Sequence, residues 1–524
     1  MRGRNWLVFG VGLLVAAVFL MNSAQLVGFG FPLDDAWIHQ TYARNLAESG
    51  RWEFVPGVVS TGSTSPLWTL LLAVGYWLGL PYLWWTYALG VVCLLWLAGS
   101  GMALWRLLWP EWRRWDWLAG LSLVLTWPLV WAAVSGMETL LFAALGLWGI
   151  LLVVRNTAVF SLRTNQNGHD GRRENIDAMK SAMWLGLLGG VLVLVRPEGV
   201  LVLGLMAVVL WWQEDTWQAR LWGVARLAGT AVLPLLPYFA FNLWSSGHLW
   251  PNTFYAKQTE YAALWQIPLW RRFMQLLYFS LGGAPEGWRG ISGAHLLLLP
   301  GMITAVWWAI KQAWTQKKWE PVLPLLWAGG HIALYAWRLP VTYQHGRYIL
   351  AAIPVWVLYG LAGGFGLWAS LDNPRLSWLS SRVAGLTYAV LLIFFILLGG
   401  RQYALDVAFI EHEMVATARW LAENTSPDAV IAAHDIGAIG YFGKRPLLDL
   451  AGLVSPEIIP LLNDQNALAK YIQTHNADYL VTAPGWPYEE IVNHYQLVPL
   501  YTTNYLWTRE QGFNNMTVYQ LKTP

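Results

Sequence analysis

The residues best suited to chemistry begin with two adjacent carboxylates, Asp34 and Asp35, directly after the first apolar segment. Adjacent carboxylates repel each other, so one of them can keep a raised pKa and act as a general base. The pair could equally cap a predicted helix over 36–47, because the dipole at a helix N-terminus favours negative charge. The local sequence supports both interpretations.

Other ionisable residues stand at the ends of later apolar segments. They are Glu138, Arg196, Glu198, His248, Lys257, His345 and Arg347. An ionisable side chain in the middle of a membrane costs about 2.5–3.5 kcal/mol on insertion scales, so its position is informative. Glu138 and the Arg196-Pro-Glu198 motif lie in very short links, which predicts that they face a shared cavity slightly below the membrane surface.

The composition explains why these positions matter. Of the 524 residues, 56% are hydrophobic and only 12% are charged, whereas a soluble domain has about 25% charged residues. Tryptophan, which favours the membrane–water interface, occurs 38 times. The net charge of +3 and the lack of a basic, aromatic-studded groove argue against nucleic-acid binding. We therefore expect a multi-pass protein of the plasma membrane, embedded in the lipid bilayer.

Apolar runs of roughly 17 to 25 residues can span a bilayer. We expect about eleven transmembrane helices, and we expect 66–80 and 262–281 to be helices in the membrane interface. The spans are 6–23, 83–104, 117–134, 138–154, 182–196, 199–212, 224–244, 294–310, 321–338, 348–369 and 383–400. Residues 182–212 are short for two spans, and a single broken helix there would change the side of every later loop.

Basic residues predict the orientation, because short cytoplasmic loops collect Lys and Arg. With a cytoplasmic N terminus, about half of the 33 basic residues fall in alternate, cytoplasmic loops. This orientation places the candidate residues at the outer ends of the spans and the tail outside. We thus expect a membrane part, 1–400, with a first outer loop over 24–82, and an extracytoplasmic domain, 401–524.

The tail is predicted to be a small α/β domain, because helices alternate in it with short apolar strands. The helices are expected at 406–423 and 467–474, and the strands at 429–433, 478–482 and 518–521. His434 and Asp435 follow the first of these strands, in a position where functional loops often begin.

Ordered motifs extend over most of the chain. The first outer loop contains Asp-Asp-Ala at 34–36, Tyr-Ala-Arg-Asn-Leu at 42–46, Pro-Gly at 56–57 and Thr-Ser-Pro-Leu-Trp at 64–68; later motifs stand at 135–139, 196–199, 251–257, 346–348 and 449–453. This set resembles the GT-C superfamily of polyprenyl-phosphate-sugar glycosyltransferases. It is most similar to the branch of mycobacterial-type arabinofuranosyltransferases and less similar to protein O-mannosyltransferases and aminoarabinose transferases. The family implies membrane-parallel helices in the first outer loop, which 36–48 and 66–80 match.

The resemblance implies inverting transfer of a hexose or pentose from a polyprenyl-phosphate donor to an acceptor hydroxyl on a glycan, lipid or protein. It implies a catalytic carboxylate at Asp34 or its neighbour, and Asp34 is our first choice for the base, although superfamily members often have Asp-Glu there. Cationic groups must stabilise the departing phosphate. Arg347 is the first choice because its planar fork suits phosphate, followed by Lys257 and Arg196.

The remaining candidates have less defined roles. His248 and His345 could donate to phosphate or sugar, Glu138 could orient the acceptor, and Glu198, His434 and Asp435 could contact the acceptor. No cofactor is indicated by a motif, although Asp34, Asp35 and Glu138 could share a divalent cation. Structural roles stay open: a lipid-headgroup anchor for Arg347, an ion pair between Arg196 and Glu198, and a helix cap at Glu138.

Two other functions compete with the transferase. A transporter of lipid or polysaccharide would place its charges near the bilayer midplane, flanked by broken helices, whereas these charges cap spans at one face. A non-catalytic scaffold would not need ionisable residues next to lipid, which are costly to insert. The sequence therefore favours a one-sided enzyme.

Overall fold

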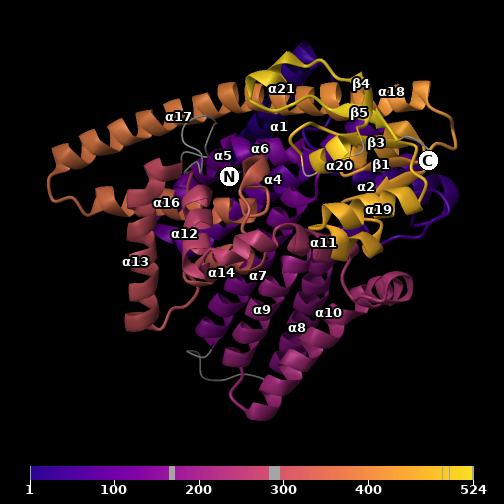
Figure 1. Ribbon diagram of the computed structural model, residues 1–524. Helices are drawn as coiled ribbons and strands as arrows, with labels where there is room; N and C mark the ends of the chain where they lie inside the picture. Colours follow the sequence, from indigo (N-terminus) through magenta and orange to yellow (C-terminus); the bar gives the residue numbers. More distant parts are fainter. Residues whose placement is uncertain (1, 164–170, 283–294, 487, 495, 522–524) are drawn as a thin grey trace.

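The computed structural model describes residues 2–163, 171–282, 295–486, 488–494 and 496–521, and it consists mainly of helices with one small sheet near the C terminus (Figure 1). Within the described residues, seven helices are long and apolar enough to cross a membrane. They are α1 (Arg2–Leu26), α4 (Tyr82–Leu108), α7 (Thr139–Arg163), α10 (Trp217–Ser246), α13 (Leu299–Gln316), α16 (Ile353–Ala369) and α17 (Pro374–Phe409).

An eighth span would come from α5 (Asp116–Leu125) and α6 (Trp127–Ala133), which follow the 3-10 turn η1 (Pro110–Trp115) and meet at a bend of 62°. The helices in three other expected spans are shorter: α8 (Gly171–Val195) and α9 (Val200–Gln213) have apolar parts of under 18 residues, and α14 (Leu323–Arg338) has 16 residues. The structure thus confirms a multi-pass helical fold, but it does not confirm a count of eleven.

Residues 182–212 form two helices rather than one broken helix. The residue before a proline avoids the helical region, and Arg196, before Pro197, is extended with φ −155° and ψ 140°. After the short turn η2 (Pro197–Gly199) the chain folds back, so that Gly199 lies against the backbone of Leu192 with no room for a side chain. Figure 1 shows α7, α8, α9 and α10 side by side.

Short helices cover the end of the bundle that holds the expected site residues. The segment 24–82, predicted to be the first outer loop, contains α2 (Asp35–Ser49) and α3 (Pro66–Trp77), which confirms that helices form there. A second group is formed by α11 (Asn252–Glu260), η3 (Ala262–Gln266) and α12 (Leu269–Ser280). Residues 262–281 are therefore two short helical segments instead of one.

The tail contains a five-stranded sheet with the strand order β2-β1-β3-β5-β4. The predicted strands correspond to β1 (Ile431–Ala433), β3 (Tyr479–Thr482) and β5 (Thr517–Gln520). The helix predicted at 467–474 corresponds to α19 (Gln465–Thr474). Neither β2 (Leu447–Asp449) nor β4 (Val498–Thr502) was predicted. Strand β2 has only three residues, and β4 is an exposed edge strand that contains Pro499. A three-residue strand gives too little alternation to recognise by itself; β1 is equally short, but it ends an apolar run of five residues, 429–433, whereas β2 ends on Asp449.

A continuous helical segment joins the tail to the bundle. Helix α17 runs past residue 400 into η6 (Ile410–Val415) and α18 (Ala416–Asn424). Glu413 is buried in η6 and accepts hydrogen bonds from the Thr503 and Thr508 hydroxyls, the Asn515 side chain and the backbone N–H of Met516. This carboxylate fixes the sheet to the long helix, so the tail is held in one orientation relative to the site.

Candidate active site

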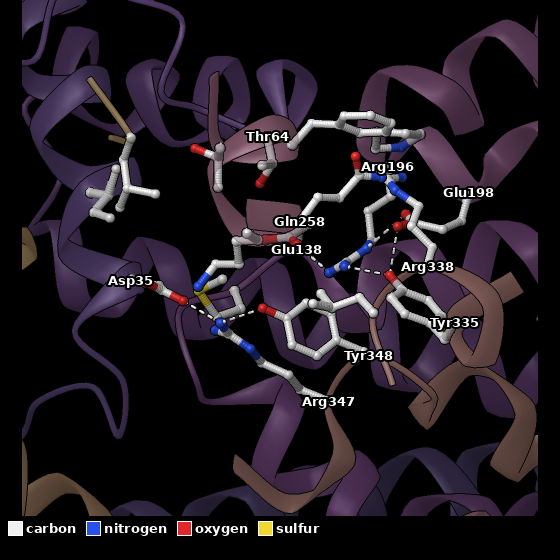
Figure 2. A pocket seen from close by; sticks show the side chains of 18 of the residues that line it. Asp35, Thr64, Glu138, Arg196, Glu198, Gln258, Tyr335, Arg338, Arg347 and Tyr348 are labelled. Atoms are coloured by element: carbon white, nitrogen blue, oxygen red, sulfur yellow. Dashed lines mark hydrogen bonds and ion pairs between the residues drawn. The ribbon is translucent and has the colours of Figure 1, made fainter. Parts of the chain in front are cut away.

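A cavity lies where α2, the start of α7, the α8–α9 turn, α11, α14 and the segment before α16 meet (Figure 2). Its charged lining comprises Asp35, Glu138, Glu198, Arg196, Lys257, Arg338 and Arg347. Six of these seven are residues that the sequence singled out. Four cations face three carboxylates, so the lining carries an excess of positive charge.

At one end of the cavity, Arg347 forms an ion pair with Asp35 and donates to the Tyr348 hydroxyl at 3.0 Å, both through Nη2. Its Nε and Nη1 are buried and have no hydrogen-bond partner among the described residues. Burial would raise the pKa of Asp35, but the charges of Arg347 and Lys257 outweigh it and hold that pKa well below its usual range. Asp35 is therefore ionised in this state.

The segment before α16 holds Arg347 in place through an unusual backbone. Gln344 and His345 adopt left-handed φ values of 54° and 58°, a conformation that costs about 1–2 kcal/mol for each residue other than glycine. Nε2 of His345 donates to the Asp406 carboxylate at 2.7 Å, and the ring packs against those of Trp127 and Trp131. His345 thus lies outside the cavity lining, where it fixes the turn that presents Arg347.

At the other end, Arg196 is surrounded by partners. It donates to Glu138 at 2.6 Å, to Glu198 at 3.3 Å and to the Tyr335 hydroxyl at 2.8 Å. Tyr335 in turn donates to Glu198 at 2.6 Å. Dashed lines in Figure 2 mark this network. The side chain of Glu138 does not serve as a helix cap for α7. Its Oε1 accepts from Arg196, and its Oε2 lies 3.3 Å from Nε2 of His39.

Asp34 points away from the cavity, towards the tail. Its two oxygens accept the backbone N–H groups of Gly437 and Ala438 at 2.7 and 2.8 Å. The tail approaches so closely that a side chain at Gly437 would collide with the Asp34 backbone. Asp34 occupies the N-cap position of α2, but its side chain makes no capping hydrogen bond to that helix. Burial, with Asp435 nearby, raises the pKa of Asp34 to about 7 in spite of the two N–H donors.

The remaining candidates lie outside the cavity lining. His248 lines a neighbouring groove. His434 lies 3.3 Å from Asp435 and 3.9 Å from Glu260, at the boundary between the tail and α11. Burial would lower the pKa of His434, but the adjacent Asp435 raises it above its ordinary value.

A divalent cation does not fit the arrangement of Asp34, Asp35 and Glu138. Asp34 is bound by backbone N–H groups of the tail, Asp35 by Arg347 and Glu138 by Arg196, so the three carboxylates have separate partners and do not converge on one point. Across the described parts of the chain, no group of three His, Cys, Asp or Glu side chains is placed to hold a metal ion. The shared cation site considered for these carboxylates is therefore not formed.

Sequence reasoning missed several polar residues of the cavity, among them His39, Gln258, Tyr335 and Arg338. His39 could have been found, because it stands four residues after Asp35 and therefore on the same face of α2. Gln258 follows the conspicuous Lys257 on α11. For Tyr335, inside the apolar helix α14, no local signal distinguishes a site residue from an interfacial aromatic one.

Comparisons with known proteins add to this geometry. A family model described as a domain of unknown function, DUF8728, matches residues 402–519. No curated protein matches the chain. Structural similarity is much broader. ArnT from Cupriavidus metallidurans in the apo state has a TM-score of 0.57 at 14% identity, over 100% of this chain and 99% of ArnT.

Two further structures match with ligands bound. ArnT from the same organism bound to undecaprenyl phosphate has a TM-score of 0.53 at 15% identity, over 99% of this chain and 98% of that one. An oligosaccharyltransferase from Archaeoglobus fulgidus, in complex with Zn and sulfate, has a TM-score of 0.54 at 12% identity, over 91% and 68%. At these identities the likeness concerns the fold. The chain has the fold of ArnT and of this oligosaccharyltransferase, in agreement with the fold that the resemblance to the GT-C superfamily implies.

Proposed function

We propose that this protein transfers a sugar from a polyprenyl-phosphate donor to an acceptor hydroxyl, on the outer face of the membrane. The observation that carries the proposal is Arg347, a buried guanidinium with two unpartnered nitrogens in a cavity. Buried polar groups are nearly always hydrogen-bonded, so this cation is best explained by an anionic ligand. The binding of undecaprenyl phosphate to ArnT, which shares the fold, supports a lipid phosphate as that ligand.

The phosphate is assigned to the end of the cavity that holds Arg347 and Lys257. Lys257 lines the cavity, and the neighbouring Tyr343, Tyr348 and Asp35 keep its pKa above the ordinary value although burial opposes this. Arg196 is a weaker candidate, because all three of its nitrogens already have partners. Charge-assisted donors of this kind stabilise the negative charge that develops on a departing phosphate.

The geometry favours Asp35, rather than Asp34, as the general base. Asp35 lines the cavity, whereas the oxygens of Asp34 are bound to the tail. Paired with Arg347, Asp35 is a weak base. A phosphate that binds Arg347 and Lys257 neutralises part of the positive charge that stabilises the Asp35 carboxylate. The pKa of Asp35 therefore rises, and Asp35 becomes a stronger base, only when the donor is bound.

In the proposed reaction, the acceptor oxygen forms a bond to the anomeric carbon while the bond from that carbon to the phosphate oxygen breaks. The phosphate leaves with the electron pair and remains bound to Arg347 and Lys257. Asp35 takes the proton of the acceptor hydroxyl. A single displacement of this kind inverts the configuration at the anomeric carbon, in agreement with the inverting transfer that the resemblance to the GT-C superfamily implies.

The test uses the purified full chain in lipid nanodiscs with radiolabelled polyprenyl-phosphate pentoses and hexoses, and a membrane extract as the source of acceptors. Release of polyprenyl phosphate and labelling of product are measured. We expect Asp35→Asn to reduce transfer by about 10²–10⁴-fold, the usual contribution of a general base, and Asp34→Asn to retain most of the rate. Loss of transfer in Asp34→Asn together with wild-type transfer in Asp35→Asn would reverse the assignment.

A further inference from the structure

A second depression adjoins the cavity on the other side of α11. It is an open groove between the bundle and the tail, with a volume of about 450 Å³, which lies within the range of about 300–1,000 Å³ typical of ligand pockets. Its side chains include His248, Tyr255, Gln258, Trp265, Ile459 and Pro460. None of the residues that line it in the described part of the chain is Asp, Glu, Lys or Arg.

Helix α11 lies between the cavity and the groove and contributes side chains to both. Thr253 and Lys257 face the cavity, Tyr255 and Thr259 face the groove, and Gln258 lines both. A third face of the helix is closed, because Ala256 is fully buried in the apolar cluster that includes Leu453 of the tail. The Asn463 side chain also donates to the Thr259 carbonyl at 3.3 Å. The groove therefore lies at a contact region between bundle and tail, and Gln258 lines both the groove and the cavity.

The chemistry of the groove is aromatic and polar without being charged. The rings of His248 and Tyr255 lie 4.9 Å apart, and Trp265 is 46% exposed. The side-chain polar groups of His248, Tyr255 and Gln258 have no hydrogen-bond partner among the described residues. Aromatic faces attract the slightly positive C–H groups of a sugar ring, and free amide, hydroxyl and imidazole groups can bond its hydroxyls.

We propose that this groove binds a neutral saccharide, which is the acceptor in the proposed transfer. The inference rests on the proposed function for its role, while the binding itself can be tested separately. An acceptor held over Tyr255 and Gln258 reaches the cavity past Gln258, on the side of Lys257. A charged acceptor is disfavoured, since the groove offers no lysine, arginine or carboxylate to pair with it.

The test is ligand-observed saturation-transfer NMR on the full chain in nanodiscs, with four probes: linear tetrasaccharides of mannose, glucose, galactose and arabinose. We expect at least one to bind with a millimolar or lower Kd. Tyr255→Ala should weaken its binding at least tenfold and His248→Ala at least threefold. Ala262→Phe, which fills the groove without removing a contact, should also weaken it. The matched control is Tyr278→Ala, which removes a tyrosine that is 51% exposed on α12.

A parallel measurement separates this inference from the proposed function. Binding of undecaprenyl phosphate should be unchanged by the groove variants and reduced by Arg347→Ala, which should still bind the saccharide. Failure of the wild type to bind the lipid phosphate would contradict the proposed function alone. Absence of binding by all four saccharides, equal binding by wild type and all groove variants, or Tyr255-dependent binding of a Ser/Thr-rich peptide instead would overturn the saccharide groove.

Discussion

Two buried arginines occupy opposite ends of one cavity and differ in how their nitrogens are used. Arg196 is 9% exposed and Arg347 is 3% exposed. Every nitrogen of Arg196 donates to a named partner, whereas Arg347 uses only Nη2 and leaves Nε and Nη1 without one. The two arginines are therefore alike in burial and differ in unused hydrogen-bonding capacity, and this difference is the basis for assigning the phosphate to Arg347 in the proposed function.

The contrast has an energetic meaning. A buried donor without a partner costs about 1–3 kcal/mol, and more for a charged group. The fold avoids this cost at Arg196 by surrounding it with Glu138, Glu198 and Tyr335. At Arg347 the cost persists, and the left-handed turn at 344–345 adds to it. Backbone strain of this kind is often found at functional sites, which agrees with the proposal that the Arg347 end binds the phosphate.

The largest expected effect lies at the satisfied end. Arg196→Met should destabilise the protein by about 3–5 kcal/mol, because it leaves Glu138 and Glu198 buried without their cation. The measurement is thermal unfolding in detergent, followed by intrinsic tryptophan fluorescence. Arg375→Met, at an exposed position at the start of α17, is the matched control and should melt like wild type. A wild-type melting temperature for Arg196→Met would remove the distinction between the two ends.

A smaller effect, and one on binding instead of stability, is expected at the unsatisfied end. Arg347→Ala should weaken undecaprenyl-phosphate binding about ten- to a hundredfold, as for a charge-assisted contact of about 1.5–3 kcal/mol. Its melting temperature should fall less than that of Arg196→Met, because Lys257 remains beside Asp35. The measurement is lipid binding by native mass spectrometry, at matched expression.

Arg347→Lys distinguishes a phosphate site from a lipid-headgroup anchor. Lysine keeps the charge but loses the planar arrangement of N–H groups, so binding should lie between wild type and Arg347→Ala. An anchor at the interface accepts either cation. Wild-type affinity in Arg347→Lys would thus favour the anchor, and wild-type affinity in both variants would exclude Arg347 from the site.

Much of the cavity could be predicted from sequence because charged residues in an apolar chain are few. Their positions at the ends of apolar segments, at one predicted face, indicated that they meet. The structure brings together Asp35, Glu138, Arg196, Glu198, Lys257 and Arg347. The GT-C fold followed from the order of the motifs. The number of spans did not follow, because α8, α9 and α14 combine apolar composition with short length, and composition alone cannot define where a short helix lies.

The division between Asp34 and Asp35 could not be predicted, because it depends on residues far away in sequence. A one-residue step on a helix changes direction by about 100°, since there are 3.6 residues per turn. Which of the two directions faces the cavity is decided by the tail, whose N–H groups at 437 and 438 bind Asp34. The position of His345 outside the cavity could not be predicted for the same reason, because its partner Asp406 lies far away in sequence, on α17.

The smallest effect concerns Asp34, which joins the unsatisfied end of the cavity to the tail. Burial, Asp435 and Asp35 raise its pKa to about 7, against about 3.9 in an unfolded chain. Between these values the folded protein keeps a proton that the unfolded chain loses, so stability from this group is complete below about pH 4 and is lost as the pH rises through about 7. Wild type should therefore be stabilised at pH 5 relative to pH 8, by an amount on the order of 1 kcal/mol.

Asp34→Asn is neutral at both pH values and should lose this part of the pH dependence. Other titrating groups are common to both proteins, so the informative quantity is the difference between wild type and variant at each pH. It is measured as hydrogen exchange of the 436–440 backbone amides, which reports opening of the tail contact itself. Asp428→Asn, at an exposed position in the tail, should keep the wild-type pH dependence. An unchanged pH profile in Asp34→Asn would show that the tail contact does not depend on the protonation of Asp34. The contact between Asp34 and the backbone N–H groups at 437 and 438 would then consist of two ordinary hydrogen bonds.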